Sequence, residues 1–366
     1  MFKRRIEALR RYLGRMGLDG LIVTLGPNRR YLTGYEPQDP GIGESAGVVV
    51  VGRVGVVLLV DARYGLTAKA QAGRWVEVEV CARPMGKDLA RLIRAMGMKR
   101  VGFEAWGMVV AQHEVLAREL EGVELVGTRG IVEELRARKD RAEVQAIEAS
   151  LALSEGVLRE LAADGLTGRS ERELAWEIER RIREKGAEAL AFEPIVAAGP
   201  RAAEPHATPG GKVIAEGEGV VVDIGARLGG YCSDITRTLV AGGAKRASAR
   251  FIEIYRAVRQ AQLKVIQALR PGMSGAEADR LARGVLAEAG LDKHFTHSLG
   301  HGVGLATHEK PSLGPGSSDK LEVGMVFTVE PGVYIPGWGG VRLEVMVEMT
   351  PEGARVLGSD EGFYEF

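Results

Sequence analysis

The chain has 366 residues, above the size at which one hydrophobic core stops growing, so two domains are expected. Hydrophobic residues make up 45% and charged residues 27%, as in an ordinary soluble globular protein. Lysine plus arginine and aspartate plus glutamate each number 49, so the formal net charge is zero, which argues against nucleic acid or an anionic membrane as a general partner.

The first part of the chain predicts alternating strands and helices. An amphipathic helix is expected over residues 3–17, where apolar residues recur at helical spacing. β-rich runs interrupted by glycine follow at 19–26 and 47–61. Helices are expected at 66–73, 88–97 and 110–121, and a further strand at 100–106. This alternation is typical of a small α/β domain, which we place at residues 1–131.

A change of composition near residue 131 marks the second predicted domain, residues 132–366. A long, charged amphipathic helix is expected over residues 133–165. Further helices are expected at 170–186, 248–269 and 274–290, and the first and last of these open with Ser-x-x-Glu capping boxes. β-rich segments occupy residues 194–198, 218–225, 229–240, 325–335 and 340–349. The second domain is therefore predicted to be α+β, with antiparallel hairpins.

The cysteine content and the N-terminal residues predict the compartment. The two cysteines, Cys81 and Cys232, do not form a disulfide framework, which fits a reducing environment. The N-terminal stretch is basic but has no apolar core segment, so it is not expected to act as a signal peptide. No apolar run is long enough to span a membrane. We therefore predict a cytoplasmic protein.

Two predicted hairpins in the second domain share one plan. The sequence "VVVDIGARLGGYCSDITRTL" carries Asp223 and Asp234 in the two arms of a strand–turn–strand unit. The sequence "MVFTVEPGVYIPGWGGVRLEVMV" carries Glu330 and Glu344 in the same way. This repetition predicts an internal duplication with a pseudo-twofold site in which the four carboxylates come together.

Any one of these four acids could lie on the solvent face of a strand. Four together are harder to explain, because each lies in an apolar or glycine-rich run and like charges repel unless a cation lies between them. Arg237 and Arg342 are near in sequence and could neutralise two of the acids, but not all four. Buried acids that do not pair with cations coordinate metals.

The histidines add possible ligands. Four of the six fall in the segment "HFTHSLGHGVGLATHE", namely His294, His297, His301 and His308, and His206 precedes the first acidic hairpin. Imidazole is the commonest neutral metal ligand, and the glycines allow a close approach of the backbone. The spacing is not that of HExxH zinc peptidases, and the sequence shows no cysteine-based zinc pattern, dinucleotide fingerprint, nucleophile elbow or phosphate loop.

These residues resemble the metallopeptidases of the pita-bread fold, a family that includes methionine aminopeptidase, aminopeptidase P, prolidase and the non-metal relative creatinase. The matching motifs are "DIGA", "YCSDITRT", "GHGVGLATHE", "VEPGVY" and "RLEV", in the family's order along roughly residues 133–350. The N-terminal segment "DGLIVTLGPNRRYLTGY" resembles the extra domain of the Xaa-Pro-cleaving members and of creatinase. The resemblance implies a creatinase-type α/β domain followed by a pita-bread catalytic domain.

The resemblance also implies a two-metal site. Asp223 would bind one ion, His301 and Glu330 would bind the other, and two acids, Asp234 and Glu344, would bridge them. An oxygen-rich set with one imidazole favours Mn²⁺ or Co²⁺, with Zn²⁺ or Fe²⁺ as alternatives. Two divalent ions would cancel the four negative charges and acidify a bridging water into a nucleophile.

The family pattern implies further roles in the same segments. His206 and His308 would contact the substrate and the tetrahedral intermediate. His297 would contact the substrate, and its alternative is an ordinary loop histidine. Arg342, two residues before Glu344, would either buttress the acids or bind substrate.

The resulting prediction is an Xaa-Pro aminopeptidase that acts on proline-containing peptides, with an Xaa-Pro dipeptidase, or prolidase, as the alternative. Ser312 stands where strict dipeptidases of the family often carry an arginine that would bind the dipeptide carboxylate, which favours longer substrates. A creatinase-like hydrolase and a non-catalytic binding protein of the same fold are weaker alternatives, because all five metal ligands are present. A homodimer is expected from the resemblance.

Overall fold

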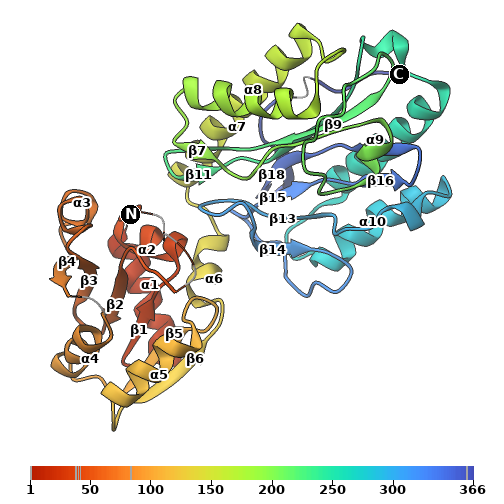
Figure 1. Cartoon of the computed structure of the whole chain (residues 1–366). Helices are drawn as coiled ribbons and strands as arrows, with labels where there is room; N and C mark the ends of the chain where they lie inside the picture. The colour runs from red at the N-terminus through yellow and green to blue at the C-terminus, as the bar shows by residue number, and fades with distance from the viewer. Residues whose placement is uncertain (1, 38, 40, 42, 83–84, 360–361) are drawn as a thin grey trace. The chain divides into compact units, whose positions relative to one another are not determined.

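The computed structural model of the protein describes residues 2–37, 39, 41, 43–82, 85–359 and 362–366. Its contacts divide the chain into two compact units, Met1–Arg136 and Ala137–Phe366 (Figure 1). Sequence composition placed a boundary after residue 131, which is the first residue of helix α6 (Ile131–Ala137). All but the last residue of this helix belong to the first unit.

The first unit is a mixed six-stranded sheet with helices, which confirms the predicted α/β architecture. Its strands, in sheet order, are β4 (Glu77–Cys81), β3 (Val56–Asp61), β2 (Val48–Gly52), β1 (Gly20–Val23), β5 (Arg100–Glu104) and β6 (Glu124–Thr128). The helices before α6 are α1 (Phe2–Arg15), α2 (Gly26–Thr33), α3 (Gly65–Gln71), α4 (Gly86–Ala95) and α5 (Val110–Glu119). The predicted β-rich run 47–61 is a hairpin of β2 and β3, in which Val54 at the turn is exposed.

The second unit has four longer helices around antiparallel sheets. The helices are α7 (Arg141–Asp164), α8 (Glu171–Glu184), α9 (Ala249–Ala268) and α10 (Gly275–Glu288). One three-stranded sheet has the order β12 (Ile235–Val240), β9 (Gly219–Ile224) and β8 (Ile195–Ala198). A five-stranded sheet has the order β14 (Glu309–Leu313), β13 (Gly300–Gly302), β15 (Val326–Val329), β18 (Val345–Thr350) and β19 (Gly353–Val356). Smaller sheets contain β7 (Ala189–Leu190), β10 (Ala226–Leu228) and β11 (Tyr231–Cys232), and β16 (Gly332–Ile335) with β17 (Gly339–Arg342).

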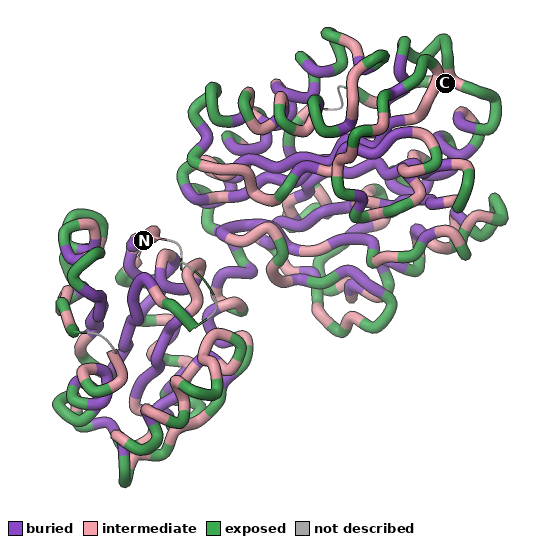
Figure 2. The backbone as a smooth tube through the Cα atoms, in the orientation of Figure 1, coloured by how far each residue is buried: buried purple, intermediate pink, exposed green. Residues whose placement is uncertain are grey.

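The predicted pseudo-twofold plan is confirmed by the way helices and strands share their cores. Helices α7 and α8 pack with β9 and β12 around residues such as Ile147, Leu174 and Val222. Helices α9 and α10 pack with β15, β18 and their neighbours around residues such as Val258 and Phe327. Figure 2 shows the buried strands of this unit as a purple centre between its helices. Each half thus repeats one hairpin covered by one pair of helices.

The long helix predicted over residues 133–165 is wrong in one respect, because the chain forms two helices, α6 and α7. Between them, the backbone N–H of Lys139 donates to the carbonyl of Gly324 at 2.7 Å. Asp140 then caps α7, since its side chain accepts the N–H of Glu143 at 3.0 Å while the Glu143 carboxylate accepts the N–H of Asp140 at 3.1 Å. The acids and bases of this stretch hid the break, because they also fit the polar face of a continuous helix. Among the described residues, no helix combines the length and apolar character needed to cross a bilayer.

The strands predicted over 229–240, 325–335 and 340–349 are also broken, in each case at an acid. Asp234 lies between β11 and β12, Glu330 between β15 and β16, and Glu344 between β17 and β18. Their backbone N–H groups find partners outside a regular ladder: that of Glu330 donates to Leu299 and that of Glu344 to Thr236. The breaks release these side chains from the alternation of a strand.

Removing the cap of α7 should destabilise the second unit measurably. We expect Asp140→Ala to lower the free energy of unfolding by about 1 kcal/mol, because the N–H of Glu143 loses its acceptor. Asp140→Ser should retain most of the stability, because a serine oxygen can accept the same bond. Thermal denaturation of the three proteins measures this, and equal melting temperatures for Asp140→Ala and the parent would contradict it.

Candidate metal-binding active site

The four predicted acids lie where two antiparallel ladders end. Strands β9 and β12 pair from Gly219 and Val240 up to Ile224 and Ile235, which leaves Asp223 and Asp234 at the open end. Strands β15 and β18 pair up to Val329 opposite Val345. Glu330 follows the first of these two residues directly and Glu344 precedes the second, so both hairpins present their acids at equivalent places.

The two hairpins are joined directly at the site. The backbone N–H of Glu344 donates to the carbonyl of Thr236 on β12 at 3.2 Å. The Thr236 hydroxyl donates to Glu344 Oε2 at 2.7 Å. Both groups are buried, and the bonds fix one acid of the second hairpin against the strand that follows Asp234 of the first.

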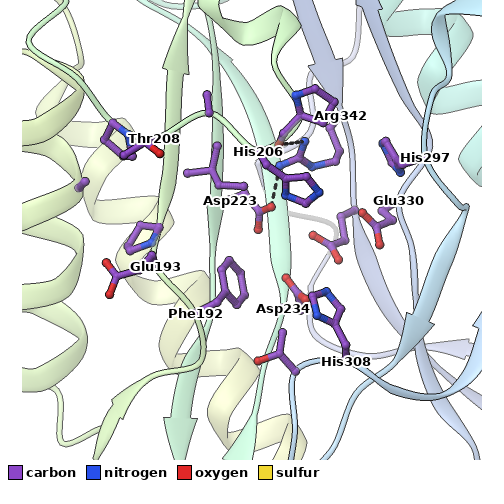
Figure 3. Close-up of a pocket in the computed structure, with 18 of the residues that line it drawn as sticks. Phe192, Glu193, His206, Thr208, Asp223, Asp234, His297, His308, Glu330 and Arg342 are labelled. Carbon is purple, nitrogen blue, oxygen red and sulfur yellow. Dashed lines mark hydrogen bonds and ion pairs between the residues drawn. The ribbon is translucent and has the colours of Figure 1, made fainter. Parts of the chain in front are cut away.

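The side chains of the five predicted ligands converge. Ligand atoms lie within 4.8 Å of one another in three groups: Asp223 with Asp234 and Glu344, His301 with Glu330 and Glu344, and Asp234 with His301 and His308. Asp234 and Glu344 each belong to two groups, as bridging ligands would. His301 Nε2 lies 3.6 Å from Asp234 Oδ2 and 3.4 Å from Glu330 Oε1. Figure 3 shows Asp223, Asp234 and Glu330 directed toward a common space.

His301 lies beside the acids on β13, a strand packed so closely against its neighbours that the residues flanking the histidine must be glycines. A Cβ at Gly300 would lie 2.2 Å from the carbonyl oxygen of Thr328, and one at Gly302 would lie 2.0 Å from that of Lys310. The close approach on both sides explains the Gly-His-Gly sequence. His301 Nδ1 donates to the carbonyl of Gly302 at 3.1 Å, so Nε2 is left as the unprotonated nitrogen that faces the acids. Burial lowers the pKa of His301 to about 4, which keeps the imidazole in its neutral, ligand form.

The four carboxylates face less positive charge than is needed to neutralise them. Burial raises the pKa of Glu330 to about 8, and burial together with the charges of the other acids raises the pKa values of Asp234 and Glu344 well above the ordinary range. Arg342 Nη2 donates to Asp223 Oδ2 at 2.6 Å, whereas the buried Asp223 Oδ1 has no hydrogen-bond partner among the described residues. Four carboxylates facing one guanidinium, with a buried oxygen left unpaired, fit a site built for divalent cations.

The second arginine considered from the sequence does not neutralise the site. Arg237 donates through Nη1 to the backbone carbonyls of Thr236 and Glu344, at 3.1 and 2.7 Å. Its guanidinium carbon lies 3.8 Å from the ring centre of Phe363, a cation–π contact on the side of the C-terminal residues. Arg237 therefore stabilises the junction of the two hairpins by bonding backbone carbonyls of both, and it does not pair with a carboxylate through these bonds.

Arg342 instead organises a hydrogen-bonded chain that the sequence did not reveal. Its Nε donates to the Thr236 hydroxyl at 3.2 Å, and its Nη1 donates to the hydroxyl of Tyr334 at 2.8 Å. The Tyr334 hydroxyl lies 2.8 Å from His297 Nε2, and His297 Nδ1 lies 2.7 Å from the carbonyl of Ser298. Since a carbonyl only accepts, Nδ1 carries the proton and Tyr334 donates to Nε2.

These hydrogen bonds involve both residues that were predicted to contact substrate, His297 and Arg342. Both ring nitrogens of His297 are engaged, and burial lowers its pKa to about 4, so it presents a neutral ring to the cavity. Arg342 has direct contacts that support the buttressing alternative. Tyr334 lies in the motif "VEPGVY" between two acids, and that position was the available signal for it.

The remaining histidines divide into two kinds. The ring of His308 packs edge-on against that of His301, with centres 4.1 Å apart. Burial, and then the nearby His206, lowers the pKa of His308, so its imidazole is neutral near pH 7. His294 lies in the short helix η3 (Asp292–His294) and does not line the cavity that holds the others.

All nine predicted site residues line a single cavity of about 870 Å³. Its wall also includes apolar and small side chains that were not predicted, among them Trp176, Phe192, Pro194, Ile195, Pro205 and Pro209. Ser312 lies exposed on the same wall, on β14. The cavity therefore combines a charged centre with an apolar surround large enough for a short peptide.

Two family descriptions match the chain. "Metallopeptidase family M24" matches residues 145–351, and "Creatinase/Prolidase N-terminal domain" matches residues 5–138. Together they span both structural units.

Individual proteins are similar over nearly the whole length. An "Uncharacterized peptidase YqhT" of Bacillus subtilis is 36% identical, covering 96% of this chain and 97% of its own. An "Xaa-Pro dipeptidase" of Pyrococcus horikoshii is 31% identical, covering 98% of this chain and 97% of its own. The structure of an Xaa-Pro dipeptidase from Bacillus anthracis superposes with a TM-score of 0.91 at 35% identity over 98% and 97%. The structure of an X-Pro aminopeptidase from Thermotoga maritima superposes with a TM-score of 0.85 at 28% identity, covering 96% of this chain and 98% of its own.

Removing either acid shared between groups should weaken metal binding. We expect Asp234→Asn and Glu344→Gln each to reduce the affinity for Mn²⁺ by at least about 100-fold, because loss of even an outer partner of a ligand costs up to that factor. Calorimetric titration of the metal-stripped proteins measures it. Glu193→Gln is the matched control, because this acid lines the same cavity outside the three groups. Equal affinities for all variants would disprove the ligand assignment.

Without metal, the protein should lose stability as the pH rises from 6.5 to 8. Glu330, with its pKa raised to about 8, keeps a proton in the folded state that the unfolded chain has already lost, so rising pH favours unfolding. Each pH unit with one such extra proton costs about 1.4 kcal/mol. The histidines with lowered pKa values act in the opposite direction, but only below about 6.5.

The measurement is the melting temperature of chelator-treated protein across this window, compared with protein in excess Mn²⁺. The metal-bound protein should show a much flatter dependence, because cations replace the protons on the acids. A metal-free melting temperature that stays constant or rises from pH 6.5 to 8 would contradict the proposed crowding of the acids.

Proposed function

The chain belongs to metallopeptidase family M24 and is a metallo-exopeptidase, and we propose that its reaction is the hydrolysis of Xaa-Pro dipeptides. The observation that carries the proposal is the convergence of four carboxylates and His301 in one cavity of a chain that matches Xaa-Pro dipeptidases from end to end. The sequence favoured an Xaa-Pro aminopeptidase because Ser312 replaces an expected arginine. The named relatives favour the dipeptidase alternative instead.

Five residues would hold two divalent cations, which we take to be Mn²⁺ or Co²⁺. We assign Asp223 to one ion, His301 and Glu330 to the other, and Asp234 and Glu344 to both. When bound, the ions would supply a water acidified to act as the nucleophile and positive charge opposite the oxygens of the peptide carbonyl. The neutral His301 and the crowding of the acids support this assignment, because an unprotonated imidazole can bind a metal and divalent cations would relieve the repulsion that raises the pKa values of the acids.

The imidazoles of His206 and His308 would handle protons and hydrogen bonds at the scissile peptide. Both line the cavity, and the lowered pKa of His308 leaves a neutral ring that can accept a proton and return it. Proton delivery matters here because the nitrogen of an Xaa-Pro bond belongs to a tertiary amide and must be protonated as it leaves. The apolar wall, with Phe192 and Ile195, would accept the proline ring and the neighbouring side chain.

Arg342 and Tyr334 would hold this machinery in place. Arg342 binds Asp223 at one end, and through Tyr334 it orients the ring of His297 at the other. A ligand and a cavity wall are thus linked by hydrogen bonds through buried groups, which resist displacement when a substrate enters.

The proposal is tested with three peptides: an Xaa-Pro dipeptide, the Xaa-Pro-Yaa tripeptide and an Xaa-Ala dipeptide. We expect the metal-loaded protein to cleave the Xaa-Pro dipeptide with kcat/KM at least about tenfold above that for either other peptide, a modest discrimination for a shaped pocket. Chelation should abolish turnover, and added Mn²⁺ or Co²⁺ should restore it.

Asp234→Asn is the inactive control and should show no turnover with any of the peptides. Preference for the tripeptide would restore the aminopeptidase interpretation. Cleavage of Xaa-Ala at an equal rate would remove the specificity for proline, and no hydrolysis with any metal would disprove the proposed function.

A further inference from the structure

The position of His206 in the cavity is set by its backbone alone. The residue lies on a loop, residues 199–210, that runs from β8 past the short helix η1 (Gly199–Ala203) toward Lys212. Its side chain is exposed to the cavity, and no hydrogen bond to its imidazole is found in the part of the chain that the structure describes. Whatever fixes this loop therefore fixes the imidazole.

One buried carboxylate holds both ends of the loop. Glu171, the first residue of α8, is fully buried, with 0% of its surface exposed. Its Oε1 accepts the N–H of Ala198 at 3.0 Å, and its Oε2 accepts the N–H of Gly210 at 3.0 Å. The residue before the loop and the last residue of the loop are thus tied to a single side chain on a helix.

Arg201 links Glu171 to the middle of the loop by hydrogen bonds. Its Nε donates to Glu171 Oε2 at 2.9 Å, so the buried charge of Glu171 is paired. Its Nη2 donates to the carbonyl of Thr208 at 2.7 Å, two residues beyond His206. A single guanidinium therefore connects the carboxylate at the ends of the loop to the backbone beside the imidazole.

A second arginine holds the other side of His206. Arg342 Nη1 donates to the carbonyl of Pro205 at 3.1 Å, and its Nη2 binds Asp223. The carbonyls before and after His206 are thus each bound by an arginine, and each arginine is anchored on a buried carboxylate. One of these anchors is a proposed metal ligand, whereas the other, Glu171, lies outside the metal groups and is not used by the mechanism.

We propose that Glu171 and Arg201 are positioning residues that hold His206 at the place where it meets the substrate. The inference rests on the proposed function, because it takes His206 to act on a bound peptide. It adds a pair of residues from outside the cluster of ligands, with a defined route of action: Glu171 orients Arg201, and Arg201 fixes the backbone on the far side of His206.

The test is a double-mutant cycle with Arg201→Lys and His206→Ala. Lysine keeps a positive charge for Glu171 but has one nitrogen, which cannot bind Glu171 and the carbonyl of Thr208 in the same fork-like way. We expect Arg201→Lys to lower kcat for an Xaa-Pro dipeptide about tenfold with little change in KM, because a displaced proton-handling group slows the chemical step. In the His206→Ala background the same change should lower kcat less than about twofold.

Two further measurements separate positioning from a loss of structure. Hydrogen exchange of the metal-loaded protein should be faster in residues 199–210 of Arg201→Lys and unchanged in α10. Mn²⁺ affinity should match that of the parent. Arg180→Lys is the matched control, because Arg180 is an arginine of α8 that bonds Glu184 on the surface and, among the described residues, has no hydrogen bond or ion pair with the loop.

The outcomes distinguish the two proposals. Equal losses from Arg201→Lys with and without His206 would overturn the positioning role, even if the parent is an active dipeptidase. If the parent cleaves no Xaa-Pro dipeptide, the proposed function fails, and exchange in residues 199–210 alone decides whether Arg201 fixes the loop. Unchanged exchange in that segment would then overturn the inference. If Arg201→Lys does not fold, Glu171→Gln probes the same hold, because a neutral amide binds Arg201 less strongly, and kcat is expected to fall only in the presence of His206.

Discussion

The structure depends on one electrostatic constraint, the crowding of three buried carboxylates and the partly buried Glu330 around the guanidinium of Arg342. In water these acids would be ionised near pH 7, but burial and mutual repulsion raise the pKa values of three of them. Among the described residues, Asp223 is the one acid of the four with an ion pair to an arginine, and its other oxygen has no hydrogen-bond partner there. The arrangement is costly for a metal-free protein and favourable for one that binds cations, so folding and metal binding are coupled.

The fold meets this constraint by placing charge where regular structure stops. Each of two hairpins delivers two acids at the open end of its ladder, and hydrogen bonds between Thr236 and Glu344 hold the hairpins together. The ligands therefore belong to the rigid part of the unit. The histidines proposed to move protons lie on loops instead, and the loop of His206 is bonded to Glu171 of α8 and Arg342 of β17. Ligands at the ends of the ladders, with imidazoles on tethered loops beside them, suit a cavity whose charged centre stays in place when a peptide enters.

The sequence predicted the composition of the site better than its geometry. Acids at matched places in two hairpins predicted a metal site, but the choice of His301 among the four histidines of its segment came from the resemblance to the pita-bread metallopeptidases. The break at Asp140 escaped notice because capping residues also suit the exposed face of a long helix. Tyr334 and Glu171 could not be recognised either, since their importance comes from hydrogen bonds to residues distant in the chain. Ser312 was the single residue behind the aminopeptidase prediction, whereas the named relatives favour the dipeptidase alternative.

The joining of the two hairpins also bears on biosynthesis. The candidate ligands extend from Asp223 to Glu344, and the last of them is held by a bond to Thr236, 108 residues earlier in the chain. A polypeptide still emerging from the ribosome lacks the second hairpin until synthesis is nearly complete, and it cannot assemble the full set of ligands before then. The proposed metal site is consequently completed only late in synthesis, after the second hairpin has been made.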